Sequence, residues 1–229
     1  MRILSIAENI AEIKHNIDLA KQKSPDPAAG VTLVAVTKMH DIPELSELAA
    51  SGQSIFGENR VQELTDKYEK LPKDIHWHLI GHLQTNKVKY IADKVELIHS
   101  LDSLELAEEI SKQMQKHGGE MPCLVQVNVA HEEQKYGIDP KDAESFIREA
   151  AKLPGVKIVG LMHIAPDYAA KEETRPLFRT MYQLFEELKR KNIPNVEMKY
   201  LSMGMSGDYK IAVEEGSNMV RIGHAVFAE

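Results

Sequence analysis

Val31–Lys38 reads VTLVAVTK, a nearly unbroken apolar run with a lysine directly behind it. Aliphatic and β-branched residues in such a run predict a strand that is covered on both faces. Pro122–Val127 is a second run of this kind. Strands covered on both faces occur in parallel sheets with helices packed against them, so these runs indicate an α/β fold.

The rest of the chain alternates between short strands and helices. Strands are predicted at 31–36, 54–56, 76–80, 95–100, 121–128, 156–162, 198–202 and 219–222. Helical patterns separate them at 44–50, 59–70, 85–92, 103–117, 140–152, 174–191 and 209–215. The strand starts lie about 27 residues apart, close to the length of one βα unit. Eight such units predict a (β/α)8 TIM barrel, with a doubly wound open sheet as the alternative.

An extra amphipathic helix is predicted before the first strand, over Ser5–Lys23. Its apolar residues recur in steps of three and four and form one stripe. The stripe consists of Ile6, Ile10, Ile13, Ile17 and Ala20. The prolines in Ser24–Pro27 end this helix, because proline cannot continue the backbone hydrogen-bond ladder. Since no linker-like segment follows, we expect residues 1–229 to form one domain.

The composition excludes several classes of protein. The chain has 28 Lys and Arg against 35 Asp and Glu, a formal charge of -7, which argues against a general nucleic-acid or anionic-membrane binder. A single cysteine, Cys123, excludes an internal disulfide framework. There is neither an apolar run of about 20 residues nor a signal-peptide pattern. We therefore expect a cytoplasmic protein, and a monomer because no large apolar surface patch is evident.

Polar residues follow almost every predicted strand, which in a barrel places them at one mouth. Lys38 follows the first strand, where partial desolvation would favour the neutral amine that forms a Schiff base. Arg221 lies inside the last strand and would direct its guanidinium into the same mouth. The alternatives are a solvated lysine and an arginine on an edge strand.

The loop Ser202–Asp208, with the sequence SMGMSGD, predicts an anion site. Gly204 and Gly207 can adopt positive φ, which allows consecutive N–H groups to converge. Ser206 adds a hydroxyl group just before a predicted helix. Gly223–His224, after the last strand, would add N–H groups to the same phosphate, since barrels often bind phosphate in these two loops. An ordinary glycine-rich turn is the alternative.

Other polar residues suggest no further site. His76, His78 and His82 lack a carboxylate at matching spacing, so we expect no metal site. Asp102 and the nearby histidines could form an acid/base pair, with a helix N-cap as the alternative. Cys123 lies in the middle of a predicted strand and is expected to be a buried, inert thiol.

Seven stretches of this sequence resemble the pyridoxal phosphate homeostasis family, the YggS/PROSC group. They are VTLVAVTK (31–38), FGENRVQE (56–63), WHLIGHLQTNK (77–87), VQVNV (125–129), GLMHIAP (160–166), LSMGMSGDY (201–209) and MVRIGHAVF (219–227). The family in turn resembles the barrel domain of bacterial alanine racemase, called fold type III. The resemblance implies a protein that binds pyridoxal 5'-phosphate and acts in vitamin B6 homeostasis.

The resemblance also implies roles for individual residues. Lys38 would form the internal aldimine with the cofactor, Arg221 would face the pyridine nitrogen, and Asn59 would line the ring. The phosphate would be held by Ser206, Gly207, Gly223 and His224. The family often has a small hydroxyl residue at the position of His224, so a backbone N–H contact is expected there.

Two features favour a carrier over an enzyme. An arginine opposite the pyridine nitrogen stays charged, so the nitrogen would remain unprotonated and the ring would be a poor electron sink. In alanine racemase, the second acid/base is a tyrosine from a separate C-terminal domain of the partner chain. This chain ends seven residues after Ile222, so we expect that domain to be absent. Tyr136, Tyr168 and Tyr209 are the loop tyrosines that remain.

We therefore expect a protein that stores or delivers pyridoxal phosphate without turnover, with pyridoxal-phosphate-dependent apoenzymes as candidate recipients. One alternative is an amino-acid racemase of low activity. Another is a Schiff-base aldolase acting on a phosphorylated substrate, which would use Lys38 and the phosphate loop without a bound cofactor.

Overall fold

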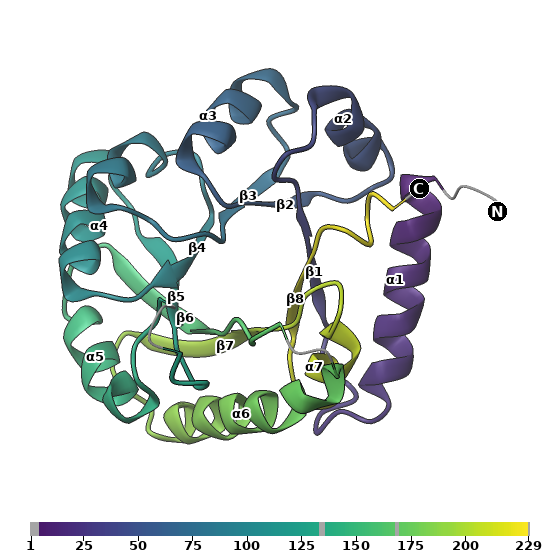
Figure 1. Ribbon diagram of the computed structural model, residues 1–229. Helices are drawn as coiled ribbons and strands as arrows, with labels where there is room; N and C mark the ends of the chain where they lie inside the picture. Colours follow the sequence, from purple (N-terminus) through teal and green to yellow (C-terminus); the bar gives the residue numbers. More distant parts are fainter. Residues whose placement is uncertain (1–4, 133–135, 168–169, 229) are drawn as a thin grey trace.

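The computed structural model describes residues 5–132, 136–167 and 170–228, and its centre is a closed barrel of eight parallel strands (Figure 1). The strands are β1 (Thr32–Val36), β2 (Ile55–Glu58), β3 (His76–Leu79), β4 (Leu97–Leu101), β5 (Met121–Gln126), β6 (Val156–Met162), β7 (Val196–Ser202) and β8 (Met219–Ile222). The barrel is closed because β1 pairs with both β2 and β8. The predicted (β/α)8 barrel is confirmed, and the open-sheet alternative is wrong.

Helices cover the outside of the barrel. They are α2 (Ile42–Ala50), α3 (Val61–Lys70), η1 (Thr85–Tyr90), α4 (Leu104–His117), η2 (Pro140–Asp142), α5 (Ala143–Ala150), η3 (Lys171–Thr174), α6 (Arg175–Arg190) and α7 (Tyr209–Glu214). The helical pattern at 85–92 forms a 3₁₀-helix, η1, and not an α-helix. Gln84 provides no side-chain cap for it, and Thr85 and Asn86 are weak helix formers.

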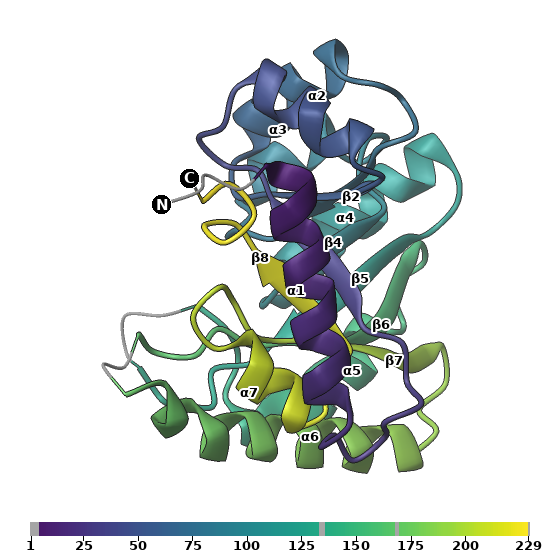
Figure 2. The same cartoon turned by 90° about the vertical axis from the view of Figure 1, so that its right-hand side faces the viewer.

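The predicted extra helix is α1 (Ile6–Lys21), which runs along the outside of the barrel beside β1 and β8 (Figures 1 and 2). It takes the place of a helix after the eighth strand. A capping box at Ser5 and Glu8 starts it. Asn9 donates hydrogen bonds to the carbonyl groups of Val226 (3.1 Å) and Ala228 (2.9 Å). The first helix therefore holds the segment that follows β8.

The strands alternate between two apolar layers, as the period of two requires. In β1, Leu33 and Ala35 pack in the layer between strands and helices, whereas Val34 and Val36 belong to the cluster inside the barrel. None of the helices in the described ranges is long and apolar enough to cross a membrane.

An ion pair inside the protein holds the end of β1 just before Lys38. Lys67 of α3 donates to Glu58 Oε1 (2.7 Å) and to the carbonyl oxygen of Thr37 (2.8 Å). The Thr37 hydroxyl donates to the same Glu58 oxygen (2.6 Å). Glu58 is 0% exposed, and its Oε2 has no hydrogen-bond partner among the residues described. Lys67 is therefore the charge that compensates this buried carboxylate.

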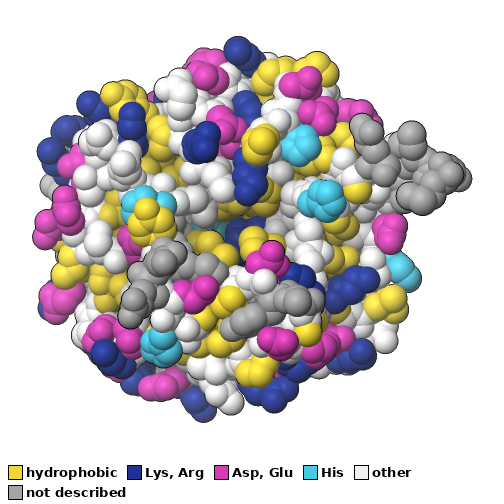
Figure 3. Space-filling model, in the orientation of Figure 1, with side chains coloured by type: hydrophobic (Ala, Val, Ile, Leu, Met, Phe, Trp, Pro, Cys, Tyr) yellow, Lys and Arg dark blue, Asp and Glu magenta, His cyan; other side chains and the backbone are white. Residues whose placement is uncertain are grey.

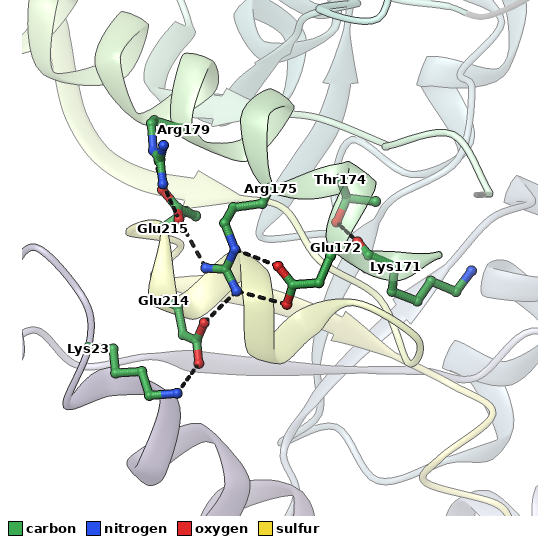
Figure 4. A network of polar contacts seen from close by, with 8 residues as sticks. All are labelled: Lys23, Lys171, Glu172, Thr174, Arg175, Arg179, Glu214 and Glu215. Carbon is green, nitrogen blue, oxygen red and sulfur yellow. Dashed lines mark hydrogen bonds and ion pairs between the residues drawn. The ribbon is translucent and has the colours of Figure 1, made fainter. Parts of the chain in front are cut away.

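A second network of charges fixes the helix after the Ser202–Asp208 loop (Figure 4). Arg175, at the start of α6, binds Glu172 (2.7 Å), Glu214 (2.8 Å) and Glu215 (3.0 Å). Glu214 also pairs with Lys23, beyond the end of α1 (3.0 Å). Glu214 and Glu215 lie at the end of α7, so the network ties this short helix to α6 and to the α1 region.

Lys67→Met is expected to lower the free energy of unfolding by about 3–5 kcal/mol, because it leaves the Glu58 carboxylate buried without its partner. Urea unfolding measures this change. The control is Lys70→Met, an exposed lysine in the last turn of α3, which should cost less than about 0.5 kcal/mol. Equal losses in the two variants would contradict the role assigned to Lys67.

Candidate functional site

A pocket of about 360 Å³ opens at the mouth formed by the carboxyl ends of the strands. Figure 3 looks onto this face, which is hollowed near its centre. The pocket is lined by Val36, Lys38, Ala165, Pro166, Asp167, Lys171, Met205, Ser206, Gly207, Asp208, Arg221, Gly223 and His224. Its volume lies within the range of about 300–1,000 Å³ that small-molecule sites occupy.

The structure brings together six of the seven residues that the resemblance suggests for the cofactor. Lys38 comes from the loop after β1, Ser206 and Gly207 from the loop after β7, and the others from β8 and the loop behind it. Asn59 is not among the residues that line this pocket; it lines another pocket, of about 770 Å³, together with residues of α3 and η1.

The backbone turns sharply directly after Lys38. Met39 has a φ of +67°, which is uncommon for a residue with a side chain, and its N–H donates to Glu63 Oε2 of α3 (3.1 Å). Lys38 itself is exposed to solvent at the rim of the pocket. The partial desolvation expected from the sequence is therefore wrong, because the turn carries this residue out of the apolar strand.

The loop after β7 has one of the two positive φ values expected. Gly204 has a φ of +96°, and a Cβ there would lie 2.6 Å from the Cβ of Ala212, so only glycine fits. The φ of Gly207 is not positive, which corrects the expectation for this residue. What its missing side chain provides is space, since a Cβ would lie 3.1 Å from Lys171 Cε.

The loops after β7 and β8 contact each other at the pocket. The backbone N–H of Ala225 donates to Ser206 Oγ (3.3 Å). Gly223 passes so close to β1 that a Cβ on it would lie 3.2 Å from both the Cβ and the carbonyl oxygen of Val36. Ser206 and Gly223 are thus held in one wall of the pocket, as a shared phosphate site requires.

Charges of both signs surround the pocket. Asp208 accepts a hydrogen bond from the N–H of Met205 (2.6 Å), and its burial raises the pKa of its carboxyl group. Lys171 forms an ion pair with Asp167 on the same rim. A second lysine, which the sequence did not single out, therefore lies in the same pocket as Lys38.

Arg221 extends into the interior of the barrel and is only 3% exposed. Its Nη1 donates to Ser202 Oγ (2.6 Å) and its Nη2 to the carbonyl oxygen of His163 (2.9 Å). Burial lowers the pKa of its guanidinium to about 10, although Asp208 acts in the opposite direction. The guanidinium therefore stays charged at neutral pH, and the edge-strand alternative is wrong because β8 is paired on both sides.

The acid/base pair considered at Asp102 lies outside this pocket. His82 Nδ1 is 3.9 Å from Asp102 Oδ2, and the imidazole stacks on Tyr136 at 3.7 Å between ring centroids. Asp102 also lies directly before Ser103, the N-cap of α4, so it belongs to the start of this helix without capping it. Burial raises the pKa of the Asp102 carboxyl group, whereas His82 acts against this shift.

In the described part of the chain, no tyrosine lines the Lys38 pocket. Tyr136 stacks on His82, Tyr209 is buried and interacts with Asn16 of α1, and Tyr168 lies outside the described residues. Cys123 is buried as expected, and burial raises the pKa of its thiol.

The histidines considered for a metal are engaged elsewhere. His76 pairs with Glu96 (2.6 Å), and His78 contacts His99 (3.0 Å). Over residues 5–132, 136–167 and 170–228, no cluster of three or more His, Cys, Asp or Glu side chains suits a metal ion.

Sequence analysis predicted a site in the loop Ser202–Asp208 but did not predict Lys171, which lines the same pocket. Lys171 carries no local signal, since it follows β6 in a loop with many charges. His99 does carry one: it is a polar residue in a predicted strand, directly after the apolar Leu97 and Ile98, and such residues often lie inside a barrel near its site.

Comparison with known proteins agrees with this geometry. The profile of the family described as "alanine racemase, N-terminal domain" matches residues 9–229. A protein of Aquifex aeolicus, named pyridoxal phosphate homeostasis protein, is 40% identical over 227 residues, which cover 99% of each chain. The chain belongs to the family of pyridoxal phosphate homeostasis proteins. The relative from Escherichia coli with the same name is 32% identical over 97% of this chain and 95% of its own.

Solved structures of the family share the barrel. PipY of Synechococcus elongatus, solved with pyridoxal phosphate bound, superposes with a TM-score of 0.84 at 36% identity, over 98% of this chain and 100% of its own. Alanine racemase from Corynebacterium glutamicum superposes with a TM-score of 0.71 at 14% identity, over 100% of this chain and 64% of its own, and shares the fold alone.

Gly223→Ala is expected to lower the free energy of unfolding by about 1–3 kcal/mol, because the new methyl group would press against the backbone of β1. Gly30→Ala is the matched control. A Cβ there meets nothing within 4 Å, so its stability should be unchanged or slightly higher. Urea unfolding of both variants measures the difference. Full stability of Gly223→Ala would contradict the close approach of the two strands' ends.

Proposed function

We propose that this chain binds pyridoxal phosphate at Lys38 and acts in vitamin B6 homeostasis as a carrier without catalytic turnover. The observation that carries the proposal is the convergence of residues from three strand ends in one pocket of suitable size. The names of its relatives and the bound cofactor in PipY support the same ligand.

The residues of the pocket fit the parts of this cofactor. When bound, the cofactor supplies an aldehyde carbon that condenses with a lysine amine. Lys38, exposed at the rim, presents such an amine without a structural barrier. Ser206 and Gly207 would hold the phosphate from one side, and Gly223–His224 from the other, because the Ala225–Ser206 hydrogen bond joins these loops.

Arg221 would meet the pyridine nitrogen as a donor. A guanidinium has no proton to yield at neutral pH, so it cannot protonate the nitrogen and strengthen the ring as an electron sink. The described residues also place no tyrosine in the pocket as a second acid or base. Both observations favour a carrier over an amino-acid racemase. Delivery to pyridoxal-phosphate-dependent apoenzymes, a monomeric state and a cytoplasmic location complete the proposal.

The Schiff-base aldolase remains the second candidate. Labelling of the two lysines of the pocket with pyridoxal phosphate distinguishes it from the carrier. After incubation with pyridoxal phosphate and reduction with borohydride, nearly all of the phosphopyridoxyl label should be found in the peptide that contains Lys38. Lys38→Ala should lose both the label and the visible absorption band. Lys171→Ala, which alters the other lysine of the same pocket, should keep both. Label on Lys171, or a wild-type protein that takes up no pyridoxal phosphate, would overturn the proposal.

Absence of turnover is tested by incubating the loaded protein in deuterium oxide with several amino acids. We expect no incorporation at the α carbon above that produced by free pyridoxal phosphate, because the ring is a poor electron sink beside Arg221. Mass spectrometry or proton NMR measures the exchange. Exchange that is well above this level and is lost in Lys38→Ala would favour a racemase.

A further inference from the structure

A row of polar side chains crosses the otherwise apolar interior of the barrel. Arg221 of β8 donates to Ser202 of β7 (2.6 Å), and Ser202 Oγ is hydrogen bonded to His99 Nδ1 of β4 (3.1 Å). His99 Nε2 in turn is hydrogen bonded to His78 Nδ1 of β3 (3.0 Å). All four residues are buried. Buried polar groups are costly unless each one has a partner, so this row requires an explanation.

The direction of the hydrogen bonds follows from Arg221. A guanidinium can only donate, so Ser202 Oγ accepts from it. The hydroxyl hydrogen of Ser202 then needs an acceptor, and the described residues offer it only His99 Nδ1. His99 must therefore carry its hydrogen on Nε2 and donate to His78 Nδ1. The hydrogen of His78 is then on its own Nε2.

The far end of the row reaches the opposite mouth of the barrel. His78 lines a pocket of about 400 Å³ at the amino ends of the strands, together with His76, Glu96 and Lys199. With Nδ1 of His78 bonded to His99, the N–H on Nε2 is the group left for this pocket. Every bond therefore points from the guanidinium toward this mouth.

Both histidines are held in their neutral form. Burial lowers the pKa of His78 to about 3, and the nearby His76 acts in the same direction. Burial also lowers the pKa of His99 well below its usual range, and the charges of His78 and Arg221 add to this shift. A neutral His99 can accept from Ser202, whereas a protonated one could not and would bring a second positive charge close to Arg221.

We propose that His99, supported by His78, is a positioning residue for Arg221. A hydroxyl group can rotate, and His99 takes up its hydrogen so that a lone pair of Ser202 stays directed at Nη1. Together with the carbonyl oxygen of His163, this fixes the two Nη atoms and leaves the remaining N–H groups for the pocket. The inference rests on the proposed function in one respect: it takes the ligand that Arg221 contacts to be the ring of pyridoxal phosphate.

The first test needs neither a variant nor the cofactor. In the ligand-free protein labelled with ¹⁵N-histidine, NMR should show His78 and His99 neutral, each with its hydrogen on Nε2, at neutral pH. A hydrogen on Nδ1 of His99, or a charged His99, would overturn the inference. This result does not depend on whether pyridoxal phosphate binds.

The second test compares variants of His99. His99→Phe removes both ring nitrogens, and His99→Asn can keep an acceptor near the position of Nδ1. We expect His99→Phe to weaken pyridoxal phosphate binding about tenfold and to shift the visible absorption band, as loss of one charge-assisted hydrogen bond would do. His99→Asn should stay within about twofold of the wild type. His76→Gln, on the same strand as His78 but outside the row, is the control and should match the wild type.

The outcomes separate the two proposals. If borohydride fails to label Lys38, the proposed function fails, while the NMR result still decides the hydrogen-bond row. If Lys38 is labelled but folded His99→Phe keeps the affinity and the absorption band of the wild type, the positioning role is wrong. If His99→Phe does not fold, Ser202→Ala replaces it, since it breaks the row at the next position and should show the same losses.

Discussion

Backbone hydrogen bonds between β1 and β8 close the barrel in the register Val34↔Arg221 and Ala35↔Ile222. This register brings Lys38 and Gly223 to the same rim, although they are far apart in the chain. The remaining parts of the site depend on it: the approach of Gly223 to Val36, the hydrogen bond from Ala225 to Ser206, and the entry of Arg221 into the barrel. The first helix supports the closure from outside, because Asn9 holds the segment that follows β8.

The interior of the barrel combines stability and function in a way that an apolar core would not. Val34, Val36 and their neighbours fill the space, but Arg221, Ser202, His99 and His78 occupy positions that aliphatic side chains could take. A satisfied polar row costs free energy relative to apolar packing, yet it specifies one orientation for its members. The benefit is that residues of three other strands hold the Arg221 guanidinium in one position beneath the pocket.

The exposed position of Lys38 suits the proposed role of a carrier. The lysine lies exposed directly before Met39, which has a left-handed backbone conformation and is itself 89% exposed. The strand end that precedes Lys38 is held by one hydrogen-bonded cluster of Lys67, Glu58 and Thr37. An exposed amine at the rim of the pocket can be reached by a ligand from solvent, as the proposed carrier role requires.

The sequence by itself determined the α/β barrel and the extra helix. It also predicted that Lys38 and the two loops expected to hold a phosphate lie at the same mouth of the barrel. Strand and helix periods are local properties, and the carboxyl ends of parallel strands always meet at one face. Only the tertiary structure decided that Asn59 lines a different pocket, that Lys171 shares the pocket of Lys38, and that Gly207 provides space and not a positive φ. Ser202 and His99 meet although they are 103 residues apart. Contacts of this kind depend on the register and stagger of the closed barrel, which no local pattern encodes.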